Sequence, residues 1–261
     1  MTSSAPPRKR GFALRLNLAL YWMAKRWLTL TLVILGIYVT LPFVAPTLMH
    51  FGYTRPAMTL YWLYKPFCHQ FGFRSFFLYG EQAVYPRATT GTTLVSFEEM
   101  IERTQPEAFQ NVSNLYAQSS QNPAELRAWL DFQWASWGFV GNEAMGYKMT
   151  ICARDIAIYL ALWLGGVLYA LVRKRLRPVP LWLWFLLGIG PIGIDGFSQL
   201  LSYPPFELWP VRETLPFFRV LTGASFGFMN AWLGYPYLEM TFNDTVRELR
   251  SKFRRAGIAV S

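Results

Sequence analysis

Cysteine and histidine are scarce in this sequence, which contains two of each in 261 residues. Cys68 and His69 are adjacent, and Cys152 stands three residues before Asp155. Thiolate, imidazole and carboxylate groups are accepted ligands of zinc and similar divalent metals in tetrahedral sites. Two cysteines on the oxidising side of a membrane can instead form a disulfide. Because an adjacent cysteine and histidine are poorly spaced for one ion, the residues alone favour a Cys68–Cys152 disulfide over a metal site at Cys68, His69, Cys152 and Asp155.

A second group of polar residues lies in or beside apolar segments. Asp195 and Gln199 are four residues apart, and Arg219 and Thr222 are three apart, so each pair shares one face of a helix. Charged side chains inside a membrane cost about 2.5–3.5 kcal/mol each, and they therefore pair with one another or line a wet cavity.

Two explanations fit this second group. Arginines gathered at one membrane surface can bind an anion through charge-assisted hydrogen bonds. We expect such a ligand-binding set to comprise Arg74, Arg154, Asp195, Gln199, Arg219 and Thr222. The alternative is structural: an acid, Asp155 or Asp195, pairs with one of the arginines and only stabilises the helix bundle.

The composition indicates an integral membrane protein. Hydrophobic residues make up 53% and charged residues only 15% of the chain, against about 25% charged in an ordinary soluble domain. Of the 25 Lys and Arg, most lie within 8–26, 173–177 and 247–255, each beside an apolar segment. This distribution follows the positive-inside rule. Without a recognisable binding module, it argues against nucleic acid as a partner.

The apolar segments predict an all-α integral membrane protein with four transmembrane helices, because about 20 helical residues cross the hydrocarbon core. We place these helices at residues 27–49, 151–172, 180–201 and 215–237. The basic segments 1–26 and 238–261 are then both cytoplasmic, and the predicted location is the plasma membrane. Glycine and proline between residues 188 and 196 predict an irregular third helix, whose freed carbonyls need partners.

Residues 50–150 form the longest segment outside the predicted membrane helices, and we call this segment the cap. Asn122-Pro123-Ala124-Glu125 is typical of a helix start, with proline at the first position and an acid in the first turn. Several tryptophans follow, enough to cover a membrane surface or a partner. We predict a small extracytoplasmic helical cap between the first and second membrane helices, rather than an independent enzyme domain.

Short motifs in a fixed order resemble a known family. They are Cys68-His69-Gln70, Arg74-Ser75-Phe76-Phe77, Gly80, Cys152-Ala153-Arg154-Asp155-Ile156-Ala157-Ile158-Tyr159, Pro191, Asp195-Gly196-Phe197-Ser198-Gln199 and Arg219-Val220-Leu221-Thr222-Gly223. Over roughly residues 60–235, this set is similar to the family of bacterial and archaeal membrane proteins called domain of unknown function 2085. The resemblance implies a membrane protein but brings no established activity.

The chain departs from that family pattern. Asp155 stands where the family has a further cysteine, Ala157 stands where it has a glycine, and residues 82–147 form an insertion. A family pattern of three cysteines and a histidine implies a metal site, in which Asp155 replaces a cysteine and favours zinc, manganese or iron. The resemblance therefore raises the metal site to parity with the disulfide.

Three functions are compatible with these residues. The leading hypothesis is a binding or accessory membrane protein whose outer mouth holds a metal or a small anion, and whose cap docks other subunits of a membrane complex. The second is an enzyme acting on a lipid-linked or phosphorylated substrate, with His69 or Asp195 as general base and arginines stabilising phosphate charge. No nucleophile and base motif supports it. The third is a small transporter, for which four helices form a narrow conduit.

Overall fold

The computed structural model describes residues 11–118 and 122–259. The first ten residues of the predicted cytoplasmic segment 1–26 and the last two of the predicted tail 238–261 lie outside the described residues, as do residues 119–121 of the cap. The helices are α1 Phe12–Lys25, α2 Trp27–His50, α3 Thr54–Tyr64, α4 Phe97–Thr104, α5 Pro123–Gly138, α6 Ala153–Val172, α7 Leu181–Trp184, α8 Gly190–Ser202 and α9 Pro216–Arg255. The strands are β1 Ser75–Leu78, β2 Gly141–Asn142 and β3 Gly146–Cys152.

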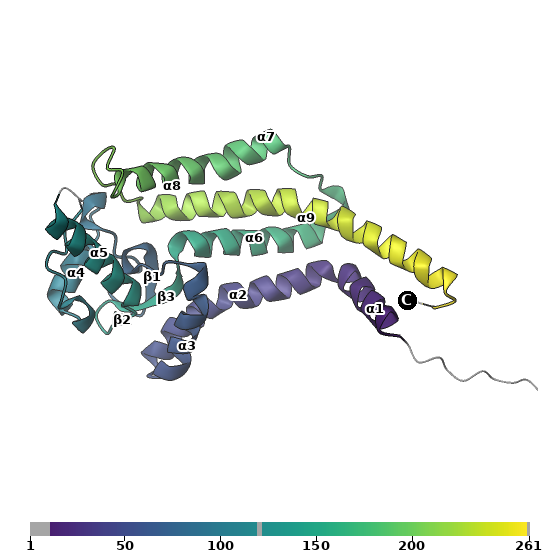
Figure 1. Ribbon diagram of the computed structural model, residues 1–261, viewed down its shortest axis with the longest axis horizontal. Helices are drawn as coiled ribbons and strands as arrows, with labels where there is room; N and C mark the ends of the chain where they lie inside the picture. Colours follow the sequence, from purple (N-terminus) through teal and green to yellow (C-terminus); the bar gives the residue numbers. More distant parts are fainter. Residues whose placement is uncertain (1–10, 119–121, 260–261) are drawn as a thin grey trace, which may run out of the picture.

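The long helices lie side by side in an elongated bundle with the cap at one end (Figure 1). α2 and α8 run toward the cap, and α6 and α9 run away from it. Within the described residues, three helices are long and apolar enough to cross a membrane: Trp27–His50, Ala153–Val172 and Leu181–Ser202. The fourth predicted segment, 215–237, begins α9 and is not one of these three. Polar residues, glycines and a proline within α9 make that segment less apolar than the other three.

Small residues allow α6 and α9 to pack closely. A β-carbon added at Gly227 would lie 2.1 Å from the carbonyl oxygen of Ile158, and one added at Gly223 would lie 2.6 Å from the carbonyl oxygen of Arg154. Gly223, Gly227 and Ala231 recur every four residues, which is the small-residue spacing typical of membrane helix pairs. This contact holds the first turn of α6, with Arg154, against α9.

The third apolar helix is irregular, as its glycines and proline predicted. A π-helical turn at Phe185–Ile189 joins α7 to α8. Pro191 has no N–H to donate to the carbonyl of Leu187. The Ser225 hydroxyl of α9 donates to that carbonyl at an O–O distance of 2.6 Å. A neighbouring helix therefore supplies the missing hydrogen bond, and α8 is tied to α9.

The cap is a mixed α/β unit, so the all-α prediction was wrong in this part of the chain. Its strands form an antiparallel sheet in the order β1-β3-β2. Local patterns did not reveal the sheet because the strands are 4, 2 and 7 residues long, and β1 pairs with a strand beyond the whole inserted segment. Phe73, Phe97, Phe132 and Met145 belong to a buried core that joins the sheet to α4 and α5.

Candidate functional site

The Cys68-His69-Gln70 motif directs its side chains to three different places. The Cys68 sulfur is buried against Cys152, whereas His69 lines a cavity between the cap and the helix bundle. Gln70 is buried with a left-handed φ of 51°. Its side-chain amide donates to a backbone carbonyl of α3 at 2.9 Å, and its own carbonyl accepts from the Lys148 ammonium at 2.5 Å. Gln70 therefore anchors the turn that separates the other two residues of the motif.

Lys148 is a fully buried charge at the centre of this anchor. Its Nζ donates to the carbonyls of Gln70, Ser136 and Trp137 at 2.5, 3.1 and 2.9 Å. Burial lowers the pKa of Lys148 to about 7, while three carbonyl acceptors favour the ammonium form. These bonds join the motif to the C-terminal end of α5 and so position the residues of the cavity wall.

Cys68, Cys152 and Asp155 bring their potential metal-ligand atoms within 4.8 Å of one another. Both cysteines are free and buried, and their Sγ atoms are 3.0 Å apart. The hydrogen bond that Cys68 donates to Cys152, together with burial, raises the pKa of the Cys68 thiol. The fourth predicted ligand, His69, is not part of this group in the described chain. Its imidazole instead stacks on Phe71, with ring centroids 5.6 Å apart.

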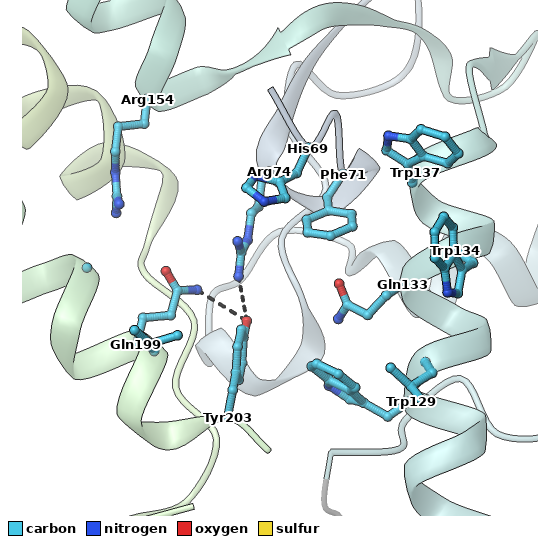
Figure 2. Close-up of a pocket in the computed structure, with 13 residues that line it drawn as sticks. His69, Phe71, Arg74, Trp129, Gln133, Trp134, Trp137, Arg154, Gln199 and Tyr203 are labelled. Carbon is cyan, nitrogen blue, oxygen red and sulfur yellow. Dashed lines mark hydrogen bonds between the residues drawn. The ribbon is translucent and has the colours of Figure 1, made fainter. Parts of the chain in front are cut away.

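The cavity beside His69 has a volume of about 710 Å³. Figure 2 shows its two walls: three tryptophans of α5 on one side, and residues of α6 and α8 on the other. The lining residues are His69, Phe71, Arg74, Trp129, Leu130, Gln133, Trp134, Trp137, Arg154, Gly196, Gln199, Leu200 and Tyr203. The cavity thus combines an aromatic wall with an arginine-bearing polar wall.

Asp195 is the acceptor for one half of the polar wall. Its carboxylate, buried within the bundle, pairs with Arg154 and accepts from Arg212 at 3.0 Å. The Thr214 hydroxyl lies 2.8 and 2.9 Å from its two oxygens. The predicted structural pairing of Asp195 with Arg154 is therefore present, but Arg212 and Thr214 are additional partners from the loop before α9.

Glu213 is the acceptor for the other half. Its carboxylate accepts from Arg74 at 2.9 Å and also from Arg219 and Gln199. Burial raises the pKa of Glu213, but the Arg74 and Arg219 guanidinium groups outweigh burial, so the net pKa is lowered. The Tyr203 hydroxyl lies 2.6 Å from Arg74 Nη2 and 3.2 Å from Gln199 Nε2, as the dashed lines in Figure 2 show.

Arginines outnumber carboxylates in this network. Among the described residues, Arg74, Arg154, Arg212 and Arg219 form their ion pairs with Asp195 and Glu213, and Asp155 adds a further negative charge near Arg154. The Nε atoms of Arg74 and Arg154, both in the cavity wall, are buried without a hydrogen-bond partner, as is the Nε2 atom of Gln133 on the opposite wall. The guanidinium groups of Arg74 and Arg154 therefore belong to the cavity wall, while their Nε atoms are buried within it.

The structure separates the predicted ligand-binding residues. Arg74, Arg154 and Gln199 line the cavity, whereas Asp195 and Arg219 lie behind its wall as ion-pair partners. Thr222 is not a lining residue, and its hydroxyl donates to the carbonyl of Phe218 within α9 at 2.8 Å.

Sequence reasoning missed Glu213, Arg212 and Tyr203, because they lie in the loop between the third and fourth predicted helices, outside the apolar segments that marked costly polar residues. Glu213 was detectable as an acid in a short loop on the side of the membrane where Arg74, Arg154 and Arg219 were expected. The aromatic wall was predicted only as a surface for lipid or a partner, since no local pattern shows that α5 packs across from α8.

Comparison with known proteins finds similarity in the second half of the chain. The family described as "Predicted membrane protein (DUF2085)" matches residues 144–233. The chain resembles this family. The match contains the Cys152 and Asp195 motifs and the start of α9, and the predicted resemblance is confirmed there.

One curated protein is similar to part of the chain. An uncharacterized protein of Methanocaldococcus jannaschii is 27% identical over 99 residues, which cover 37% of this chain and 58% of the relative. The chain thus spans little more than half the length of that relative. No solved structure matches the chain.

Proposed function

We propose that the protein is a multi-pass plasma-membrane protein that binds an anionic amphiphile in the cavity between α5 and α8. The acidic head of the ligand lies at Arg74 and Arg154, and its apolar part lies along the tryptophans of α5. The observation that carries this proposal is that two arginines, Arg74 and Arg154, line a cavity whose opposite wall is formed by tryptophans.

The proposal includes four membrane-spanning helices, with the first part of α9 as the fourth. Its support is the alternating direction of α2, α6, α8 and α9 in the bundle (Figure 1). The basic residues of 173–177 and 247–255 lie at the end of the bundle away from the cap. By the positive-inside rule, that end and both termini are cytoplasmic, and the cap with its cavity is extracytoplasmic.

The polar wall suits an acidic headgroup. A guanidinium group binds a phosphate or carboxylate through parallel charge-assisted hydrogen bonds. Arg74 is held by Glu213 and the Tyr203 hydroxyl, and Arg154 is held by Asp195, so both guanidinium groups are fixed in the cavity wall. Gln133 lines the opposite wall. An acidic group between the walls would lie beside two guanidinium groups.

The aromatic wall suits an apolar chain that arrives from the bilayer. Leu200 lines the cavity and is 51% exposed, and Trp134 of the opposite wall is 65% exposed. Ile194 and Phe197 of α8 are also exposed, so this side of α8 is a lipid-facing surface. The cavity therefore borders the hydrocarbon region, and a lipid can place its head inside while its chains remain in the membrane.

A calorimetric titration of the purified full chain in a neutral detergent tests the proposal. The probes are a single-chain alkyl phosphate, the uncharged alcohol of the same chain length, and inorganic phosphate. We expect the alkyl phosphate to bind and the other two to bind at least about tenfold more weakly, because each supplies only one of the two required parts. Inorganic phosphate that binds as tightly would indicate a free-anion site, and an alcohol that binds as tightly would contradict a role for the arginines.

Variants assign the binding to the cavity. Arg154→Gln removes a charged donor, and hydrogen bonds to charged groups are worth about 1.5–3 kcal/mol, so alkyl phosphate affinity should fall about 10- to 100-fold. Arg127→Gln is the matched control, because Arg127 lies on α5 but is 85% exposed and does not line the cavity. Equal affinities in the two variants would place the ligand elsewhere.

A further inference from the structure

The cysteine cluster lies next to the cavity but is a separate feature. Cys68 follows the short turn after α3, Cys152 ends β3, and Asp155 lies in the first turn of α6. In the sheet, Cys152 is paired with Ser75 of β1. The Cys152 backbone N–H also donates to Cys68 Sγ at 3.2 Å. The fold of the cap therefore fixes the two sulfur atoms relative to each other and places Asp155 one helical turn away.

Asp155 is the unusual member of this cluster. It is partly buried, and in the described chain it forms no ion pair, although its neighbour Arg154 pairs with Asp195. A carboxylate removed from water requires a cation or hydrogen-bond donors. The Cys68 side chain and the positive charges of Arg154, His69 and Arg219 lie near it. The single S–H proton of Cys68 donates to Cys152, so a metal ion would give Asp155 a cation in direct contact.

The environment of Cys68 also suits a metal-bound thiolate. Its sulfur accepts from two backbone N–H groups, those of Gln70 at 3.4 Å and Cys152 at 3.2 Å. Hydrogen bonds from surrounding groups to ligand atoms orient and tune metal sites. Gln70 holds its N–H in place through the buried anchor with Lys148, so this donor does not depend on the metal.

We propose that Cys68, Cys152 and Asp155 bind a divalent zinc-type metal ion. Zinc binds thiolate at about 2.3 Å and carboxylate at about 2.0–2.2 Å, so a tetrahedral site needs sulfur atoms roughly 3.8 Å apart. The Sγ atoms are 3.0 Å apart, and loss of the thiol protons with a small outward rotation of the side chains brings them to that separation. Three protein ligands leave the fourth position to water or to an exogenous donor.

The ligand set differs from the one that the sequence predicted. His69 is outside the cluster and turns to the cavity, so it is not a ligand here. This difference gives the proposal a specific signature: metal binding should require Asp155 and both cysteines but not His69.

Cobalt(II) binding to the reduced full chain in neutral detergent tests the site, with zinc as competitor. Wild-type protein should bind one cobalt ion per chain, with thiolate-to-cobalt charge-transfer absorption that zinc abolishes. Asp155→Asn should weaken cobalt binding at least about tenfold, and Cys68→Ser or Cys152→Ser should remove the charge-transfer band. His69→Ala is the matched control and should keep both the band and the stoichiometry.

Further measurements show whether each variant is folded and whether the two cysteines are linked. Gel-filtration behaviour and the thermal unfolding temperature show that each variant is folded, independently of the metal. Thiol titration with and without reductant shows whether the cysteines are linked. Reduced, folded protein that binds no cobalt would overturn the proposal, and so would an Asp155→Asn variant that binds cobalt as tightly as the wild type. Cysteines released only by reductant, in a chain that takes no metal afterwards, would establish the disulfide instead.

Discussion

An ion pair in the cap and the arginine network at the cavity differ in how completely their charges are matched. In the cap, Arg87 is paired with Glu98 at 2.5 Å, and the side chains are only 3% and 0% exposed. Its remaining bonds go to the carbonyls of Leu115 and Ala117, and its guanidinium group lies 4.1 Å from the centre of the Phe132 ring. At the cavity, four arginines share two carboxylates, and two Nε donors have no partner.

The difference distinguishes a closed structural ion pair from the network at the proposed binding site. One arginine matched by one acid closes a polar network inside a hydrophobic core, and nothing remains to attract a ligand. A surplus of guanidinium groups beside a cavity leaves charge that an anion can neutralise. The structural alternative is present as the Arg154–Asp195 pair, whereas ligand binding by the arginines stays a prediction.

The largest expected loss of stability comes from breaking the Arg87–Glu98 ion pair. Arg87→Met leaves Glu98 as an unpaired buried charge, and breaking a buried pair in this way costs about 3–5 kcal/mol. We expect a large fall in the thermal unfolding temperature in neutral detergent and faster proteolysis within the cap. Adding Glu98→Leu should recover most of the lost stability, because no unpaired charge then remains. An Arg87→Met variant as stable as the wild type would show that the Arg87–Glu98 pair does not stabilise the cap.

A smaller effect is expected at the acceptor of the cavity network. Glu213→Gln removes a carboxylate that Arg74 and Arg219 share, and we expect a loss of about 2 kcal/mol, since hydrogen bonds to charged groups are worth about 1.5–3 kcal/mol. Thermal unfolding at neutral pH measures it. Glu98→Gln, which removes the cap carboxylate, provides the comparison and should be more destabilising, because Glu98 is the acid that pairs with Arg87, whereas Arg74 also has the Tyr203 hydroxyl as a partner.

The pH dependence of stability gives a finer test of the same residue. The pKa of Glu213 is lowered in the folded protein, so its ionised form stabilises the fold above the ordinary glutamate pKa of 4.5. That contribution should decline as the pH falls below 4.5 toward the lowered pKa, where the folded state must take up a proton. The unfolding temperature of Glu213→Gln should therefore fall less steeply over this pH range than that of the wild type. Parallel curves for the two proteins would contradict the lowered pKa.

The smallest loss of stability should come from replacing an arginine of the cavity network, in which four arginines share two carboxylates. Arg154→Gln leaves Asp195 with Arg212 and Thr214, so we expect a loss of about 1 kcal/mol or less, in the range of solvent-accessible ion pairs. Thermal unfolding without added ligand measures this loss. An effect as large as that of Arg87→Met would place Arg154 among the structural pairs and remove the distinction between the clusters.

Much of this architecture follows from the sequence, because hydropathy and basic clusters are strong local signals. The three apolar helices and the irregular turn near Pro191 could be predicted in this way. The cap sheet and the cavity could not, because they depend on contacts between segments far apart in the chain. Glu213 joins Arg74 to Arg219 across such a distance. His69 shows the same limit: adjacency to Cys68 suggested a shared ligand set, but the turn held by Gln70 separates the two side chains.

Competition between lipids, followed by native mass spectrometry, tests the central claim most directly. The full chain in neutral detergent is mixed with equal amounts of phosphatidylglycerol and phosphatidylcholine that have identical acyl chains. The detergent is then removed in the mass spectrometer. The proteins compared are the wild type, Arg154→Gln and the surface control Arg127→Gln. We expect the wild type and the control to retain the anionic lipid preferentially at one bound lipid per chain, and Arg154→Gln to lose that preference about tenfold or more. Equal retention of both lipids by the wild type, or an unchanged preference in Arg154→Gln, would contradict a binding role for the surplus arginines.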